Sequence, residues 1–329
     1  MILRKIALEA CLAVSLLTGF AADGEPRTVR MAVATFSQSI LPMVVAREKG
    51  YFQTEDLDVE LILMTAAAAN MALIGGNVDF ISSGPSAIVA IIRGAPLKFV
   101  FVCFSRPMHW LYAKPDIKDV RELKGKKIGV SAIGASTQFL IQEILKRNGL
   151  DPARDVTILG VGTTANRFAA LKAGTIEATN LTPPFNFRAQ DEGLREIVAF
   201  VKQDYLVEPA GAIVVRDHLL QSDPRLVEKV AKGTLKGLLY IRQNRMGTIP
   251  ILAKLMKIPN DLAAKIYDLV LPGLTLDGTL DSQFQRKVLE FVTGVQGIKE
   301  PAPPEKVYDF APVRKIRAEL EAAKWRPGE

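Results

Sequence analysis

Short apolar runs alternate with amphipathic stretches over the first hundred residues of the chain. The predicted strands are Val29 to Thr35, Val59 to Met64, Val78 to Ile81 and Leu97 to Phe104. The stretches between them have helical periodicity and end at glycines, such as Gly50 and Gly94. Apolar strands that alternate with helices are typical of a parallel sheet that is covered on both faces. The pattern therefore predicts an α/β fold.

The same pattern returns from Lys127 and matches the first part at an almost constant offset. Arg30–Val33 matches Lys127–Val130 and Leu57–Ile62 matches Arg154–Leu159, both 97 positions later, Ala72–Asp79 matches Ala170–Glu177 at 98, and Gly94 matches Gly193 at 99. Four matches in order predict two doubly wound lobes built on one plan, with a ligand cleft between them. The alternative is the generic spacing of α/β units without a shared plan.

After Ala210 the chain changes to one strand, Gly211 to Val215, followed mainly by helices. The predicted helices are Pro224 to Arg245, Ile249 to Met256, Pro259 to Leu271, Ser282 to Gly294 and Pro312 to Trp325. Because these helices have no sheet of their own, we expect them to pack on the first lobe. Lobe 1 would then comprise residues 26–110 and 212–329, and lobe 2 residues 111–211. The chain would cross between the lobes near Arg106 to Lys114 and Val207 to Ala212.

The first 22 residues have the pattern of a secretory signal peptide. Arg4 and Lys5 precede an apolar stretch from Ala10 to Phe20, and Ala21-Ala22 follows it. The apolar stretch is too short to span about 30 Å of hydrocarbon. We expect a cleaved signal peptide at residues 1–22 and a soluble periplasmic protein.

Composition and charge fit a globular protein that binds a small ligand. The 329-residue chain is 49% hydrophobic and 23% charged, which is ordinary for a globular protein. Loss of Arg4, Lys5 and Glu9 with the signal peptide lowers the net charge from +7 to +6. This excess is compatible with an anionic ligand, but the basic residues are scattered, so we expect no nucleic-acid partner. Cys103 remains as the single cysteine after cleavage, which excludes an internal disulfide.

Hydroxyl-rich loops follow the predicted strands in both halves of the chain. In a doubly wound sheet, ligands bind outside the carboxyl ends of the strands, and helix N-termini there attract anions. The candidate ligand-binding residues in these loops are Thr35, Phe36, Ser37, Ser39, Ser82, Ser83, Gly134, Ser136, Thr137, Thr163, Thr182 and Phe185. Taken singly, each Ser or Thr is better explained by capping of its own helix. The ligand-binding interpretation rests on the convergence of six such loops on one cleft. Phe36 and Phe185 either sandwich a ligand or pack in the core.

Catalytic and metal-binding motifs are missing from the sequence. His109 and His218 are far apart, and no HxxxH, CxxC, GxSxG, GxGxxG or glycine-rich GKS/GKT motif occurs. Cys103 lies in an apolar run and is interpreted as a core residue. Arg106, at the first crossing, either pairs with a ligand anion or is an exposed hinge residue. We expect no metal, no organic cofactor and no catalytic residue.

Four segments resemble one family of binding proteins. They are Pro42–Phe52 with Leu57–Leu61, Ala72-Leu73 to Gly76–Phe80, Leu123–Val130 and Leu239–Arg245. These segments resemble the ABC-importer substrate-binding proteins of the nitrate, sulfonate, taurine and thiamine-precursor group. The resemblance covers nearly the whole chain after the signal peptide.

The resemblance implies a type II periplasmic-binding-protein fold, whose two lobes close around a small solute. It also implies delivery of that solute to an ABC permease with its ATPase, with contact to the membrane through the permease alone. We expect a monomer. The family's cleft loops correspond to Thr35–Ser39, Ser82–Pro85, Gly134–Thr137 and Thr182–Phe185. The segment Thr65–Ala69 consists of one threonine and four alanines where a ligand-specific residue could stand. A small organic anion and a polar heterocycle therefore both remain open as the ligand.

An enzyme on the same fold is the competing hypothesis. The related yeast-type pyrimidine synthase relies on histidine and a cysteine-rich motif, and this chain lacks that motif. Enzymes of menaquinone biosynthesis share the architecture but usually lack a signal peptide. The sequence favours a transport role, with an enzyme as the alternative.

We predict that the exported protein lacks the segment up to about Ala22, because a short apolar stretch followed by small residues favours cleavage there. Intact-mass measurement of the exported protein checks this. A mass that includes the N-terminal segment would contradict the prediction.

Overall fold

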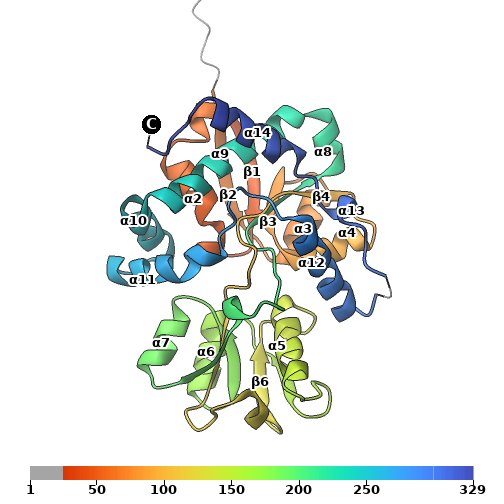
Figure 1. The fold of residues 1–329 in the computed structure, drawn as a ribbon, viewed down its shortest axis with the longest axis vertical. Helices are drawn as coiled ribbons and strands as arrows, with labels where there is room; N and C mark the ends of the chain where they lie inside the picture. Colours follow the sequence, from red (N-terminus) through yellow and green to blue (C-terminus); the bar gives the residue numbers. More distant parts are fainter. Residues whose placement is uncertain (1–24, 299, 329) are drawn as a thin grey trace, which may run out of the picture.

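The structure, a computed structural model, describes residues 25–298 and 300–328. The predicted signal peptide lies outside the described residues. Within these residues the chain forms two β-sheets that are flanked by helices and stacked along the long axis of the molecule (Figure 1).

The first sheet contains β1 (Arg27–Val33), β2 (Leu57–Leu63), β3 (Phe80–Ser83), β4 (Leu97–Phe101) and β10 (Ala212–Arg216). Its strand order is β2-β1-β3-β10-β4. Strand β1 pairs in parallel with β2 and β3, whereas β10 runs antiparallel to β3 and β4. β10 is buried from Ala212 to Val215 because strands flank it on both sides.

The second sheet contains β5 (Trp110–Ala113), β6 (Lys127–Val130), β7 (Thr157–Gly160), β8 (Ala178–Leu181) and β9 (Arg195–Ala199). Its order is β7-β6-β8-β5-β9, with β5 antiparallel to β8 and β9. This order repeats that of the first sheet, as the internal match in the sequence predicts. The expectation of wholly parallel sheets is wrong, because each sheet receives one antiparallel strand where the chain crosses between them.

Helices follow the strands and cover the sheets. The first sheet carries α2 (Leu41–Glu48), α3 (Ala66–Ile74) and α4 (Pro85–Ile92), and the second carries α5 (Ser136–Arg147), α6 (Thr164–Lys172) and α7 (Phe185–Asp191). Short 3₁₀ turns are η1 (Gln38–Ile40), η2 (Gln53–Glu55), η3 (Val120–Leu123), η4 (Phe200–Lys202) and η5 (Leu271–Gly273). These elements confirm the predicted α/β fold class.

The C-terminal helices pack on the first sheet and its helices (Figure 1). They are α8 (Asp217–Ser222), α9 (Pro224–Gln243), α10 (Arg245–Met256), α11 (Asn260–Val270), α12 (Ser282–Val295), α13 (Pro304–Val307) and α14 (Ala311–Ala322). Helix α9 contacts α2 and α14, and α12 contacts α4. The predicted extra C-terminal helices are therefore present. Three short elements, β5, α8 and α13, were not predicted. They are four to six residues long, and unlike the equally short β3 they are not part of the regular alternation of strands and helices.

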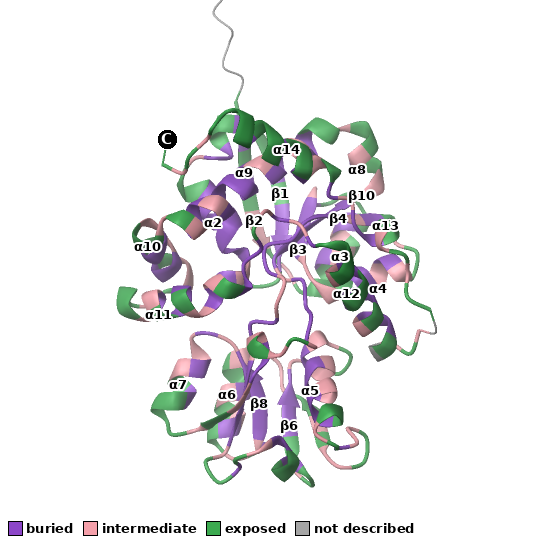
Figure 2. Ribbon diagram, viewed as in Figure 1, coloured by how far each residue is buried: buried purple, intermediate pink, exposed green. Residues whose placement is uncertain are grey.

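The strands and the inner faces of the helices form the core, which appears as the purple interior of each sheet in Figure 2. Cys103 is fully buried as a free thiol, as predicted, and burial raises its pKa far above the ordinary value. No helix in the described part of the chain is both long and apolar enough to cross a membrane.

The two crossing segments bind each other through their backbones. The N–H of Phe104 donates to the carbonyl of Ala210 at 3.0 Å, and the N–H of Ala210 donates to the carbonyl of Phe104 at 2.9 Å. This antiparallel bridge holds the connections that leave β4 and enter β10 at one place. The two sheets are thus joined by a narrow double connection.

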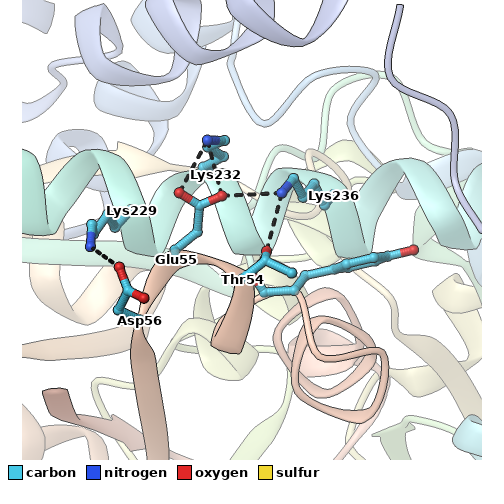
Figure 3. A network of polar contacts seen from close by, with 7 residues as sticks. Thr54, Glu55, Asp56, Lys229, Lys232 and Lys236 are labelled. Carbon is cyan, nitrogen blue, oxygen red and sulfur yellow. Dashed lines mark hydrogen bonds and ion pairs between the residues drawn. The ribbon is translucent and has the colours of Figure 1, made fainter. Parts of the chain in front are cut away.

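A charged cluster ties the η2 turn to α9, about 180 positions later in the chain (Figure 3). The Glu55 carboxylate lies 3.0 Å from Lys232 Nζ and 3.1 Å from Lys236 Nζ. Lys236 also donates to Thr54 Oγ1 at 3.3 Å. The side chains of Glu55 and Lys236 are only 10% and 9% exposed. Asp56 pairs with Lys229 at 3.0 Å, but there the carboxylate is 83% exposed.

We predict that Glu55→Gln lowers the free energy of unfolding by about 1–3 kcal/mol, because it leaves the buried Lys236 ammonium without a carboxylate. Asp56→Asn is the matched control. It breaks an exposed pair that contributes about 0–1 kcal/mol, and Asn tolerates the left-handed backbone of Asp56. Urea unfolding of both variants measures the difference. Equal, small losses would contradict the structural role of Glu55.

Candidate functional site

A cavity of about 640 Å³ lies between the loops of the two sheets. The first sheet contributes the loops that follow β1 and β3, and the second contributes the loops that follow β6 and β8 with the N-terminus of α6. The predicted residues that line it are Thr35, Ser37, Ser39, Ser82, Ser83, Gly134, Ser136, Thr137, Thr163 and Thr182. The structure thus gathers these residues around one space, and their contact with a ligand stays a prediction.

Several of these hydroxyls have local hydrogen-bond partners, as the capping alternative expects. Thr163 Oγ1 accepts from the N–H of Asn166 at 3.2 Å and caps α6. Ser37 Oγ lies 3.0 Å from Ser39 Oγ. Thr137 Oγ1 accepts from the N–H of Ser131 at 3.1 Å. These side chains order the loops, and the bonds leave other hydroxyl lone pairs unused.

The N-termini of α4 and α5 differ from that of α6, because neither has a side-chain cap. The residues preceding these helices are Gly84 and Ala135, and both line the cavity. Backbone N–H groups in the first turn of each helix therefore have no side-chain acceptor. The positive ends of two helices, one from each sheet, border the same cavity, which favours a negatively charged ligand group.

Arg167, on α6, is a cavity residue that the sequence analysis did not identify. It is 2% exposed. Its Nη1 donates to the carbonyl of Gly162 at 2.6 Å, its Nη2 to Thr164 Oγ1 at 3.1 Å, and its Nε to the carbonyl of Asn180 at 3.2 Å. Burial lowers the pKa of the guanidinium to about 10, so it stays charged at neutral pH. A usable signal was the position of Arg167 four residues before the buried Leu171, on one helix face.

His109 and Glu208 form a second polar group in the cavity wall. His109 Nε2 lies 3.5 Å from the Glu208 carboxylate. The other ring nitrogen, Nδ1, lies 3.1 Å from the side-chain nitrogen of Asn180. Glu208 is 7% exposed and follows the buried residues Leu206 and Val207. A charged residue directly after an apolar pair was the available signal for this site.

Three predicted residues lie elsewhere. Phe36 is 43% exposed and is not in the cavity wall. Arg106 pairs with Asp204 at 3.0 Å and does not line the cavity. The Phe185 ring packs 5.7 Å from the ring of Phe168, with the Arg188 guanidinium 5.3 Å from it. The structure does not bring these three side chains together with the hydroxyl loops.

A second crevice, of about 610 Å³, lies between α5 and α12. Long charged side chains line much of it, including Lys146, Lys287 and Glu290. One of them, Arg147, already donates to Glu143 at 2.8 Å. Because the crevice lies away from the strand ends, the cavity between the loops is the better candidate site.

Within residues 25–298 and 300–328, no three His, Cys, Asp or Glu side chains gather as metal ligands. The expectation of no metal cofactor stays a prediction.

Glycines allow the second crossing segment to approach the cavity loops. Gly211 has a φ of 61°, and a side-chain carbon there would overlap the carbonyl oxygen of Ser39. A side-chain carbon at Gly84 would lie 2.7 Å from the carbonyl oxygen of Pro209. The first-sheet loops and the segment Pro209–Gly211 therefore pack backbone to backbone. This packing places Glu208 in the cavity wall.

The sequence and the fold were compared with known proteins. The family described as NMT1/THI5 like matches residues 37–245. A Bacillus subtilis protein provisionally named binding protein YtlA is 25% identical over 255 residues, which cover 74% of this chain and 72% of that protein. The yeast 4-amino-5-hydroxymethyl-2-methylpyrimidine phosphate synthase THI11 of Saccharomyces cerevisiae is 31% identical over 133 residues, which cover 39% of this chain and 38% of that protein.

The fold also matches a solved structure, that of the periplasmic aliphatic sulphonate binding protein SsuA from Escherichia coli. The TM-score is 0.69, the sequence identity is 20%, and the match covers 85% of this chain and 91% of that chain. At this identity the likeness establishes the fold. It confirms the periplasmic-binding-protein architecture with two doubly wound sheets.

We predict that Gly211→Ala destabilises the protein through two effects. A non-glycine residue in this left-handed conformation costs about 1–2 kcal/mol, and overlap of the methyl group with Ser39 costs about 1–3 kcal/mol more. Gly149→Ala is the control, since Gly149 has a φ of 78° but an added carbon there meets nothing within 4 Å. Urea unfolding compares the two. A loss no larger than that of the control would contradict the close backbone packing.

Proposed function

This chain belongs to the NMT1/THI5-like family, and we propose that it is the solute-binding component of an ABC importer. It captures a small organic anion or polar heterocycle between its two sheets and delivers it to a membrane permease with its ATPase. The observation that carries this proposal is the cavity of about 640 Å³, to which loops from both sheets contribute. The names of YtlA and SsuA, both binding proteins, support it.

The narrow double connection supports a mechanism of capture by closure. We assign residues 26–110 and 212–329 to one lobe and residues 111–211 to the other, except that Trp110 begins β5 and so belongs with the second sheet. The two connecting segments that the Phe104–Ala210 bridge holds together act as the hinge, because the chain passes from one lobe to the other through them. Rotation about it brings hydroxyls such as Ser83 and Ser136, from opposite sides of the cavity, onto one ligand.

The role implies a place and a set of partners. The protein works in the periplasm after cleavage of its signal peptide, meets the membrane only through the permease, and acts as a monomer without nucleic acid. The similarity to SsuA, a periplasmic binding protein, supports this location.

A second candidate function is an enzyme on the same fold. The yeast synthase relative and the His109–Glu208 pair in the cavity wall favour it. The two functions differ in the fate of the bound solute. Mass spectrometry of the solute after prolonged incubation separates them, because a binding protein returns it unchanged and an enzyme returns a product.

We predict that a thermal-shift screen of small anions and heterocycles finds a solute that raises the melting temperature, because such a ligand binds only the folded state. Ser83→Ala and Ser136→Ala then each weaken its binding about tenfold or more. A lost hydrogen bond to a charged group costs about 1.5–3 kcal/mol. Calorimetric titration measures this.

The control variant is Ser222→Ala, which removes an exposed hydroxyl on α8, outside the cavity wall. It should bind like the parent protein. Parent-like binding by both cavity variants would contradict a ligand held from both lobes. Weakening of one variant alone would place the ligand on a single lobe.

A further inference from the structure

The cavity wall carries two opposite charges. Among the described residues that line it, Arg167 and Glu208 are those with a formal charge at neutral pH. The other lining residues are apolar, glycine or polar groups without a permanent charge, and among them His109 contacts Glu208. The charge pattern of the cavity is therefore bipolar.

The Arg167 guanidinium has neutral acceptors and no carboxylate partner in the described part of the chain. Its three hydrogen bonds within the described residues go to two backbone carbonyls and one hydroxyl. A guanidinium has five N–H groups, so two remain. A buried charge without a counter-charge is costly. An anionic ligand group would supply that counter-charge.

The Glu208 carboxylate has unfilled hydrogen-bond acceptor sites, just as the Arg167 guanidinium has unused donors. Its polar contact within the described residues is His109 Nε2 at 3.5 Å, and its side chain is 9% exposed. An ionised carboxylate offers about four acceptor sites. A ligand ammonium or amino N–H at this place would fill them.

Asn180, on β8, contacts both Arg167 and His109, and so it fixes the position of Arg167 relative to the His109–Glu208 pair. Its backbone carbonyl accepts from Arg167 Nε at 3.2 Å, and its side-chain nitrogen lies 3.1 Å from His109 Nδ1. Asn180 is fully buried, and its side-chain oxygen has no hydrogen-bond partner among the described residues. A chain of contacts thus runs from the Arg167 guanidinium through Asn180 on β8 and His109 to the Glu208 carboxylate.

We propose that the cavity selects a small zwitterion, whose anionic group binds Arg167 and whose ammonium group binds Glu208. This inference rests on the proposed binding function and makes its ligand class specific. A simple anion would pair with Arg167 but would be repelled by the Glu208 carboxylate. A simple cation would pair with Glu208 but would be repelled by the Arg167 guanidinium. A zwitterion compensates both buried charges at once.

The test uses matched probes with and without the amine, titrated calorimetrically at neutral pH. The pairs are 2-aminoethanesulfonate with ethanesulfonate, 2-aminoethylphosphonate with ethylphosphonate, and 3-aminopropanoate with propanoate. Ethylammonium serves as the cation alone. At least one zwitterion should bind the parent protein tenfold or more tightly than its deaminated partner and than ethylammonium. This comparison does not depend on the folding of any variant.

Two variants then test which residue binds the anionic group of the zwitterion and which binds its ammonium group. Glu208→Gln should weaken binding of the zwitterion at least tenfold and leave the deaminated anion unchanged or tighter. Arg167→Lys should weaken both, because a lysine cannot reproduce the guanidinium contacts. The controls are Glu48→Gln and Arg245→Lys, whose parent residues pair with Lys254 and Asp268 outside the cavity. Melting temperatures without probe show that each variant is folded.

An anion without an amine that binds as tightly as its zwitterionic partner would overturn the inference and leave the importer function standing. Equal weakening of both probe types by Glu208→Gln would also overturn it. Failure of every probe, and of every solute in the wider screen, would contradict the proposed function together with the inference.

Discussion

The structure depends on an exchange of strands between two sheets. β10 enters the first sheet between β3 and β4, and β5 enters the second between β8 and β9. Each inserted strand is central and buried, so neither sheet is complete without a segment that has just crossed from the other. The crossing segments must therefore run side by side, and the Phe104–Ala210 bridge is the result. The same constraint makes the loops at the carboxyl ends of both sets of parallel strands face each other.

The architecture was largely predictable because it rests on periodicity and repetition. Apolar runs and glycine stops placed most strands and helices, and the constant offset predicted two sheets of matching order. β5 was not predictable in this way. The four residues Trp110–Ala113 carry no periodic signal, and their antiparallel partners on β8 and β9 lie about 65 to 90 positions later in the chain. Strand pairing over such separations depends on tertiary context rather than local preference.

The candidate site was likewise predictable only where the signal is local in the sequence. The hydroxyl loops were identified because they follow strands, and position at a strand end is a local property. Arg167 and Glu208 were missed because charged side chains are ordinarily exposed, and their burial depends on acceptors and packing that appear only in the folded chain. The guanidinium of Arg167 is tolerated inside because the carbonyls of Gly162 and Asn180 accept from it. Glu208 is buried because Gly211 lets its segment approach the backbone of Ser39. Neither acceptor nor close approach can be read from the neighbouring residues alone.

The two halves share a plan but contribute different chemistry to the cavity. The first sheet provides the hydroxyls of Ser37, Ser39 and Ser83 and no formal charge, while α6 of the second provides Arg167. The long return helix α9, held to η2 by Glu55 and packed against α2, stiffens the first half. In the proposed mode of binding, both charged contacts, Arg167 and Glu208, come from residues 111–211, and the first half contributes hydroxyls. In the proposed closure, these hydroxyls add hydrogen bonds to a solute whose two ends the charges already orient. The internal repeat accounts for the two facing sets of loops, and the departure from the repeat accounts for the division of charged and hydroxyl contacts between the halves.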